Sequence, residues 1–303
     1  MGGQPAIAAL IRHCSAITRP ASATPIAASQ AAARRAETRR RALVAGGSVG
    51  AVLVLVVVMI VIGLVSAPAP ATSAPAAVDA AAARDITTVP AATFNLVGAG
   101  TASGLTAIGG QPELADHSKP ELLYMGGEFC PYCAAERWAI AAAVSRFGTL
   151  TGIRFIRSSP DDVYPQTPTL SFYGASYASK YLDFAPVEWY GEKQDPGTPL
   201  RHVYLQHPTA QQIALFAEFA GDAIPFVDIG NRYVVPQTQY LPSALAGLSW
   251  AQVAAAMHDP ASTVGKDIDG AANMISAAIC KLTGGKPRNV CASAGVAAAG
   301  SSI

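Results

Sequence analysis

The feature that most constrains this 303-residue chain is the sequence Cys130-Pro131-Tyr132-Cys133. The apolar run before it, at 122–125, predicts a buried strand, and the Ala-rich segment after it predicts a helix. Proline is favoured in the first turn of a helix, so the helix should begin at the motif. A cysteine at that point faces unpaired backbone N–H groups and the positive end of the helix dipole, and both favour its thiolate. Cys133, three residues later, lies on the same helix face and within disulfide reach.

Strand, paired cysteines and helix together predict a dithiol/disulfide redox centre. In this interpretation Cys130 exchanges with a partner, and Cys133 resolves the mixed disulfide that results. Glu128 or Glu136 is expected to accept the proton of the resolving thiol, although each is as consistent with a surface charge, Glu136 especially, beside Arg137. The alternatives for the motif are a static disulfide and half of a zinc site.

A second region supports the redox interpretation. Residues 223–235 predict two short strands joined at Gly230-Asn231. Pro225 stands where the first strand begins, and proline belongs there at an edge or turn because it cannot donate to the ladder. The order of elements between about 118 and 282 resembles the thioredoxin fold. That resemblance implies that Pro225 is cis and faces the cysteines, and that the backbone of Ile224 pairs with an extended substrate.

The resemblance extends to four particular stretches of sequence: FCPYCAAERW, YASKYLDF, PFVDIGNRY and ICKLTGGKPRNVC. They are similar to a family of membrane-anchored thioredoxin-like proteins from high-GC Gram-positive bacteria. Pro131-Tyr132 is also the dipeptide of the glutaredoxins, which implies that these two residues contact substrate. The implied fold is α/β, with a central mixed sheet flanked by helices, and the implied reaction is thiol–disulfide exchange in either direction. No particular substrate is implied.

The N-terminal region predicts a membrane anchor. Residues 1–42 have few large apolar side chains and predict a disordered tail that ends in an arginine cluster. Leu43–Val65 carries no charge, and its 23 residues would span roughly 35 Å as a helix, enough to cross a hydrocarbon core of about 30 Å. Arginines before the span place the N-terminus in the cytoplasm and the rest outside. The prolines that follow Val65 favour an anchor that is not cleaved.

Beyond the anchor, residues 66–84 predict an Ala/Pro-rich linker and 85–303 an extracytoplasmic domain. Within the domain, 85–117 should form short irregular strands or loops. Disulfides persist outside the cytoplasm, and we expect Cys280 and Cys291 to form a structural one around the Gly-Gly turn between them.

An aromatic-rich insertion is predicted at about 158–208, between a strand at 153–156 and a helix at 209–220. Alternating patterns at 170–173 and 180–184 predict a hairpin within it. The insertion either packs on itself or presents an aromatic wall beside the cysteines that would bind an unfolded chain. Two further helices are predicted at 249–258 and 264–282.

Composition and spacing narrow the expected partners. The formal net charge of +1 and the absence of a basic run in the exported part argue against nucleic acid. We expect no cofactor and no metal, because the histidines lack ligand spacing and Gly284-Gly285-Lys286 lacks the phosphate-loop frame. The expected partners are exported cysteine-containing proteins, a membrane redox protein and the lipid bilayer.

Two rival functions remain at the level of sequence. A redox-inactive thioredoxin-like scaffold in a cell-envelope complex would keep Cys130 and Cys133 oxidised. A zinc site would use those two with Cys280 and Cys291, but ten residues separate the second pair, unlike the two to four of a typical zinc-ligand pair.

Overall fold

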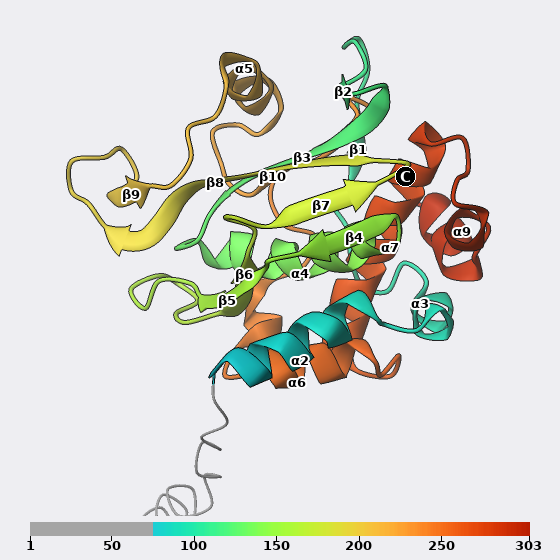
Figure 1. The fold of residues 1–303 in the computed structure, drawn as a ribbon, viewed down its shortest axis with the longest axis horizontal. Coiled ribbons are helices and arrows are strands. Elements are labelled where there is room, and N and C mark those ends of the chain that lie inside the picture. Colours follow the sequence, from blue (N-terminus) through green and yellow to red (C-terminus); the bar gives the residue numbers. More distant parts are fainter. Residues whose placement is uncertain (1–74) are drawn as a thin grey trace, which may run out of the picture. The chain divides into compact units, whose positions relative to one another are not determined.

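The computed structural model describes residues 75–303 (Figure 1). The predicted tail at 1–42, the predicted span at 43–65 and the first part of the predicted linker lie outside these residues. Within 75–303, no helix combines the length and apolar character needed to cross a membrane.

The described part is mixed α/β, with one central sheet. Along the sheet the strands run in this order: β1 (Thr106–Ala107), β11 (Tyr233–Val235), β10 (Phe226–Ile229), β3 (Lys119–Gly127), β8 (Asp183–Gln194) and β9 (His202–Tyr204), with the short β2 (Ala115–Asp116) paired to β3. Strands β3 and β8 are parallel, and the other pairs are antiparallel. The predicted strand at 122–125 is therefore the middle of β3, with β10 on one side and β8 on the other.

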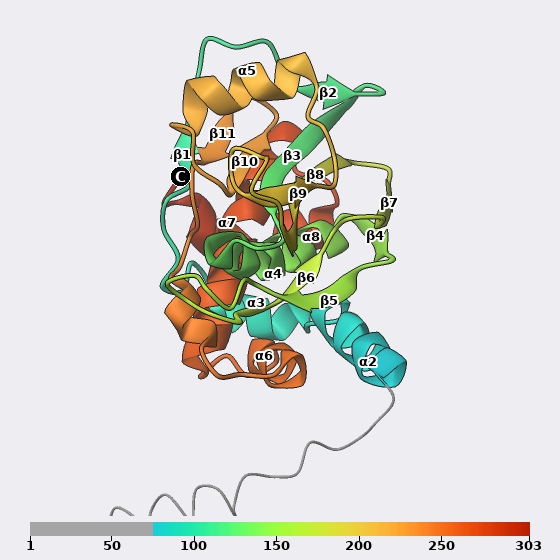
Figure 2. The same ribbon diagram turned by 90° about the vertical axis from the view of Figure 1, so that its left-hand side faces the viewer.

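Helices cover both faces of this sheet (Figure 2). Leu122 and Tyr124 of β3 belong to the core shared with α4 (Pro131–Ser145) and α7 (Thr263–Leu282). Leu123 and Met125 belong instead to the smaller core under α5 (Ala210–Phe219). Successive side chains of a strand point to opposite faces, so an unbroken apolar run is what a strand covered on both sides requires.

The predicted helices begin close to where their capping residues stand. Thr209 caps α5 and Ser249 caps α6 (Trp250–Met257), each with a reciprocal capping box to a glutamine three residues on. Ser262 caps α7. A short 3₁₀ turn, η1 (Pro242–Leu245), precedes α6, and two short helices, α8 (Arg288–Cys291) and α9 (Ala294–Gly300), follow α7.

The start of the described chain differs from the sequence prediction. Residues 75–84 were expected to be linker, yet they belong to helix α2 (Pro75–Thr87), and α3 (Ala91–Val97) follows where strands or loops were expected. Alanine is the strongest helix former, so an Ala-rich segment turns helical once it has a surface to cover. Ala82, Ile86 and Phe94 supply that contact, because all three are buried in the larger core.

The segment predicted as an insertion at about 158–208 is not an addition to the fold, because one of its strands lies in the central sheet. The strand expected at 153–156 is β5 (Arg154–Arg157), which pairs with β6 (Pro168–Ser171) outside the central sheet. Likewise β4 (Gly148–Thr151) pairs with β7 (Ser176–Ser179), so the predicted hairpin does not form. The parallel neighbour of β3 is β8, from inside the segment taken as an addition. Its proline and its buried Glu188 interrupt the apolar run that identifies a central strand.

Candidate functional site

Strand β3 and helix α4 place the two cysteines. Cys130 is the N-cap residue of α4, and its Sγ accepts a hydrogen bond from the backbone N–H of Cys133 at 3.3 Å. Pro131 occupies the first turn, as expected of a proline at a helix start. Within the described residues neither sulfur is in a disulfide. Cys130 keeps 5% of its surface exposed while Cys133 has none, so a partner would reach Cys130 first.

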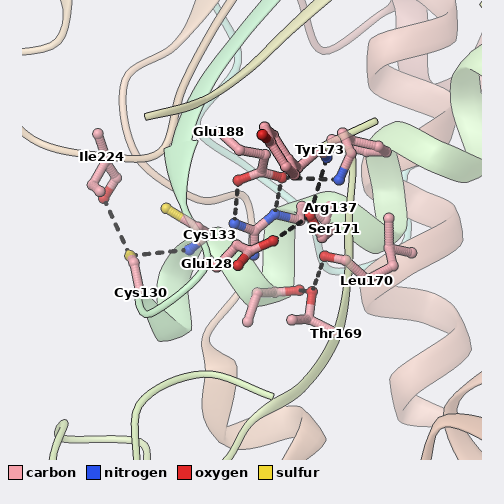
Figure 3. A network of polar contacts seen from close by, with 12 residues as sticks. Glu128, Cys130, Cys133, Arg137, Thr169, Leu170, Ser171, Tyr173, Glu188 and Ile224 are labelled. Carbon is pink, nitrogen blue, oxygen red and sulfur yellow. Dashed lines mark hydrogen bonds and ion pairs between the residues drawn. The ribbon is translucent and has the colours of Figure 1, made fainter. Parts of the chain in front are cut away.

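The loop before β10 reaches the same point. The peptide bond between Ile224 and Pro225 is cis, and the carbonyl oxygen of Ile224 lies 3.8 Å from Cys130 Sγ, which donates to it as a thiol (Figure 3). The structure therefore brings Cys130 and Cys133 together with Ile224 and Pro225, which follow the cysteines by more than ninety residues in the chain.

The two thiols differ in acidity. Burial alone would raise the pKa of Cys130, but hydrogen bonds from the side chain and backbone of Cys133 and the positive charge of Arg137 outweigh it, and the pKa is lowered from 9.0. Burial raises the pKa of Cys133 well above that value, and its hydrogen bond to Cys130 raises it further. Cys130 is therefore the more acidic thiol of the pair, and Cys133 is the less acidic one.

A buried ion pair lies behind the cysteines. Arg137 is fully buried on α4, and its Nε and Nη2 donate to the two carboxylate oxygens of Glu188 at 2.8 and 2.6 Å. In Figure 3 this pair lies on the far side of Cys133 from Ile224. Sequence reasoning missed both residues. The available signal was Arg137 four residues after Cys133, on the same helix face, in a helix that is otherwise almost free of charge.

The two glutamates expected near the resolving thiol have other partners. Glu128 accepts hydrogen bonds from the Ser171 hydroxyl at 2.6 Å and from Arg154 at 2.8 Å. Glu136 is not the surface charge it resembled beside Arg137, because it is fully buried and accepts from the backbone N–H of Gln239 at 2.9 Å. Burial raises its pKa from 4.5 to about 7. Among the described residues, the structure pairs neither carboxylate with a cysteine.

Aromatic residues of the 158–208 segment border the motif and also fill the core. Tyr132 meets the ring of Tyr164 edge-on at 5.7 Å, and the carbonyl of Phe129 accepts from the N–H of Ser159 at 2.8 Å. Phe172, by contrast, is buried against Tyr124. Part of the segment therefore packs into the main core rather than only on itself, and part lies beside the cysteines; binding of an unfolded chain there stays a prediction.

The remaining described cysteines form their own pair. Cys280, in the last turn of α7, is bonded to Cys291 of α8, with their Cα atoms 5.5 Å apart. A disulfide sulfur is not a thiolate ligand, so these residues do not complete a zinc site with Cys130 and Cys133.

Part of the chain is similar to a known protein family. A protein family described as "Domain of unknown function (DUF929)" matches residues 109–207. The match covers β3, both cysteines of the motif and β8, and it ends before Pro225. No curated protein and no solved structure matches the chain.

Proposed function

We propose that this protein is a membrane-anchored, extracytoplasmic thiol–disulfide oxidoreductase with a thioredoxin-like fold. It would act on exported cysteine-containing proteins through Cys130 and Cys133. The observation that carries the proposal is the difference between the two sulfurs, since one is a helix N-cap with a lowered pKa and the other a buried thiol with a raised pKa. A static structural disulfide needs no such difference.

The reaction follows from that difference. The Cys130 thiolate attacks one sulfur of a partner disulfide, forms a Cys130–partner bond and releases the other partner sulfur as thiolate. Cys133 then loses its proton and attacks Cys130 Sγ, which breaks the mixed disulfide and frees the second partner sulfur. The partner is reduced by two electrons, and Cys130–Cys133 becomes the disulfide. Run backwards, the same steps oxidise a partner dithiol.

The order of elements supports the thioredoxin-like part of the proposal. The resemblance calls for a cysteine-bearing helix, strand, helix, a strand behind Pro225, hairpin partner and helix. The chain supplies α4, β8, α5, β10, β11 and α7 in that order. The Ile224 carbonyl lies at Cys130, which leaves an extended partner segment a place to pair beside the reacting sulfur.

The location outside the membrane is supported by sequence and by chemistry. The charge-free run at 43–65 follows the arginine cluster, and the Cys280–Cys291 disulfide suits a compartment where disulfides persist. A reporter that is active only outside the cytoplasm, fused after Ile303, should be active. Activity of a cytoplasmic reporter instead would reverse the orientation.

Trapping in cells tests the reaction. Cys133→Ala should leave partners covalently attached to Cys130, as species that are lost on reduction, because the resolving attack is missing. Cys130→Ala should trap little, since Cys133 is buried, and Cys130→Ala/Cys133→Ala is the matched control. If Cys133→Ala captures no more than the double variant, the exchange proposal fails and the scaffold function replaces it.

A further inference from the structure

Two buried polar atoms beside Cys133 lack partners. Among residues 75–303, the Tyr124 hydroxyl and Nη1 of Arg137 are both enclosed and without a hydrogen bond. Both side chains are fully buried. Leaving a buried donor unpaired costs free energy, so two such donors at one place require an explanation.

Within the described residues, the contacts of the Arg137 guanidinium leave only its Nη1 without a hydrogen bond. Nε and Nη2 are taken by Glu188, whose Oε1 also accepts the N–H of Phe172 at 3.1 Å. Arg137 lies one helical turn after Cys133, so the two side chains share a face of α4 (Figure 3). The guanidinium is thus anchored by Glu188 of β8, and its positive charge acts on both thiols in the direction that lowers the pKa of each.

The Tyr124 hydroxyl of β3 lies in the neighbourhood of Cys133 Sγ. A Cβ atom added to Gly126 would overlap the Tyr124 hydroxyl oxygen and would lie 3.2 Å from Cys133 Sγ. The hydroxyl and the sulfur therefore both border the α-carbon of Gly126. The Arg137 guanidinium lies over the Tyr124 ring, 5.7 Å from its centre, so the two donors are held together.

We propose that Arg137 and Tyr124 are positioning residues that stabilise the Cys133 thiolate while it attacks the mixed disulfide. This inference rests on the proposed exchange function and assigns its second step. The two donors stabilise the anion that remains when Cys133 loses its proton. Neither accepts that proton, which was the task the sequence suggested for Glu128 or Glu136; the proton passes to the partner thiolate released in the first step.

The charges around Cys133 explain the timing of this step. In the reduced protein the Cys130 thiolate raises the pKa of Cys133, both by its charge and by accepting the Cys133 S–H, while Arg137 and the N–H of Gly127 lower it. Once Cys130 is bonded to a partner, its charge and its acceptor are gone, and the lowering contributions remain. Burial keeps the pKa of Tyr124 well above 10.0, so its hydroxyl stays a donor throughout.

Two carboxylates near the motif are held in ion pairs, while Glu136 of α4 is buried without a cation and its pKa is raised to about 7. Glu188 of β8 is paired with Arg137, and Glu128 is paired with Arg154 of β5. A buried ion pair is by itself weak evidence for stability, since apolar side chains of the same size often serve as well. The positive charge of Arg137, unlike an apolar side chain of the same size, can stabilise a thiolate that forms on Cys133.

Stopped-flow reaction with dithiobis(nitrobenzoate) separates the two steps. Attack by Cys130 releases one coloured thiolate, and resolution by Cys133 releases the second. The full-length protein is used in detergent with Cys14→Ser, with Cys130 and Cys133 reduced and Cys280–Cys291 still bonded, so that only the motif reports. Tyr124→Phe removes an oxygen that has no partner, and it should fold normally. Arg137→Met/Glu188→Gln removes both charges, so that no lone buried charge is left.

We expect the second release to slow about tenfold in Tyr124→Phe, with its pH midpoint raised by about one unit, while the first release is unchanged. Arg137→Met/Glu188→Gln should shift the same midpoint upward. Tyr177→Phe is the control, because that hydroxyl donates to Val144 near the other end of α4. Unchanged rate and midpoint of the second release in both variants would overturn the inference while leaving exchange intact. A parent protein that gives only one release would overturn the exchange function itself.

Discussion

The two cysteine pairs of the described chain stand at opposite ends of helices. Cys130 caps the N-terminus of α4, where unpaired N–H groups and the helix dipole favour a thiolate. Cys280 lies in the last turn of α7, where the dipole is negative and disfavours one. The first pair is free and the second is bonded. The pair for which we propose exchange and the pair that forms a disulfide therefore stand at helix ends of opposite charge.

The chain between each pair extends this contrast. Cys130 and Cys133 are separated by one helical turn that holds one sulfur over the N–H of the other residue. The segment between Cys280 and Cys291 contains Gly284 and Gly285, both with positive φ, which let the chain reverse after α7. The spacing of the first pair lowers the pKa of Cys130, and the second pair closes a loop of the chain.

The largest expected effect is on exchange activity. Cys130→Ser should abolish the reduction of a fluorescently labelled glutathione disulfide, because Cys133 is buried and its pKa is raised. Cys280→Ser/Cys291→Ser should retain that activity. Loss of activity in the second variant with an unchanged near-ultraviolet circular dichroism spectrum would make the second pair a relay to the first, and the contrast between the pairs would fail.

Thermal stability should depend on the two pairs in the opposite way, because it should fall more when Cys280 and Cys291 are replaced than when Cys130 and Cys133 are. On the chain-entropy estimate, a loop of this size contributes about 3 kcal/mol. Cys280→Ser/Cys291→Ser should therefore lower Tm by roughly 6–12 °C in a unit of this size. Calorimetry of the oxidised parent and the variant measures the difference. A shift no larger than that of Cys130→Ala/Cys133→Ala would mean that the C-terminal pair is not the structural one.

The sequence predicted the elements that local signals define. The strand at 122–125, the helix at the motif, the helices capped by Thr209 and Ser249, and the β10–β11 hairpin at Gly230-Asn231 are all present. Each depends on residues close in the chain, such as a cap, a turn or an apolar run. The mixed α/β class follows from their order.

The parts of the fold that the sequence did not predict depend on contacts between residues far apart in the chain. Strand β8 was hidden because its buried Glu188 is neutralised by Arg137, 51 residues earlier in the chain. Glu136 looked like a surface charge because the donors to its Oε2 come from Thr238 and Gln239, about a hundred residues later in the chain, while its Oε1 has no partner among the described residues. Periodicity treats a charge as exposed, and only the fold shows which charges have a partner.

The pH dependence of stability and of exchange should run in opposite directions. Burial raises the pKa of Asp269 from 3.8 to about 8 and that of Glu136 from 4.5 to about 7. The folded protein thus keeps protons that the unfolded chain has released, so the free energy of unfolding should fall as pH rises from about 4 to about 8. The Cys130 thiolate increases over a range that begins below pH 9.0, so attack should quicken as pH rises.

Asp269→Asn tests the stability half of that opposition. Among the described residues, neither carboxylate oxygen of Asp269 has a hydrogen-bond partner, so the amide should raise stability at pH 8 by on the order of 2 kcal/mol and flatten the pH slope. Urea unfolding at pH 5 and pH 8 measures both quantities. Asp161→Asn, at an exposed position, is the control that should leave the slope unchanged. An equal slope in Asp269→Asn and the parent would show that this carboxyl is ionised in the folded protein.

The smallest expected effect concerns Glu128, which the sequence offered as a proton acceptor. Its carboxylate is held by Ser171 and by Arg154, whose side chain is 52% exposed, and an exposed cation contributes little to such a pair. Glu128→Gln keeps an oxygen for Ser171 and should lower stability by less than about 1 kcal/mol. The second thiolate release should stay within about twofold of the parent, because the donors beside Cys133 are untouched. A slowing as large as that of Tyr124→Phe would return Glu128 to the reaction, and the difference between the pairs would then involve a carboxylate as well as a helix end.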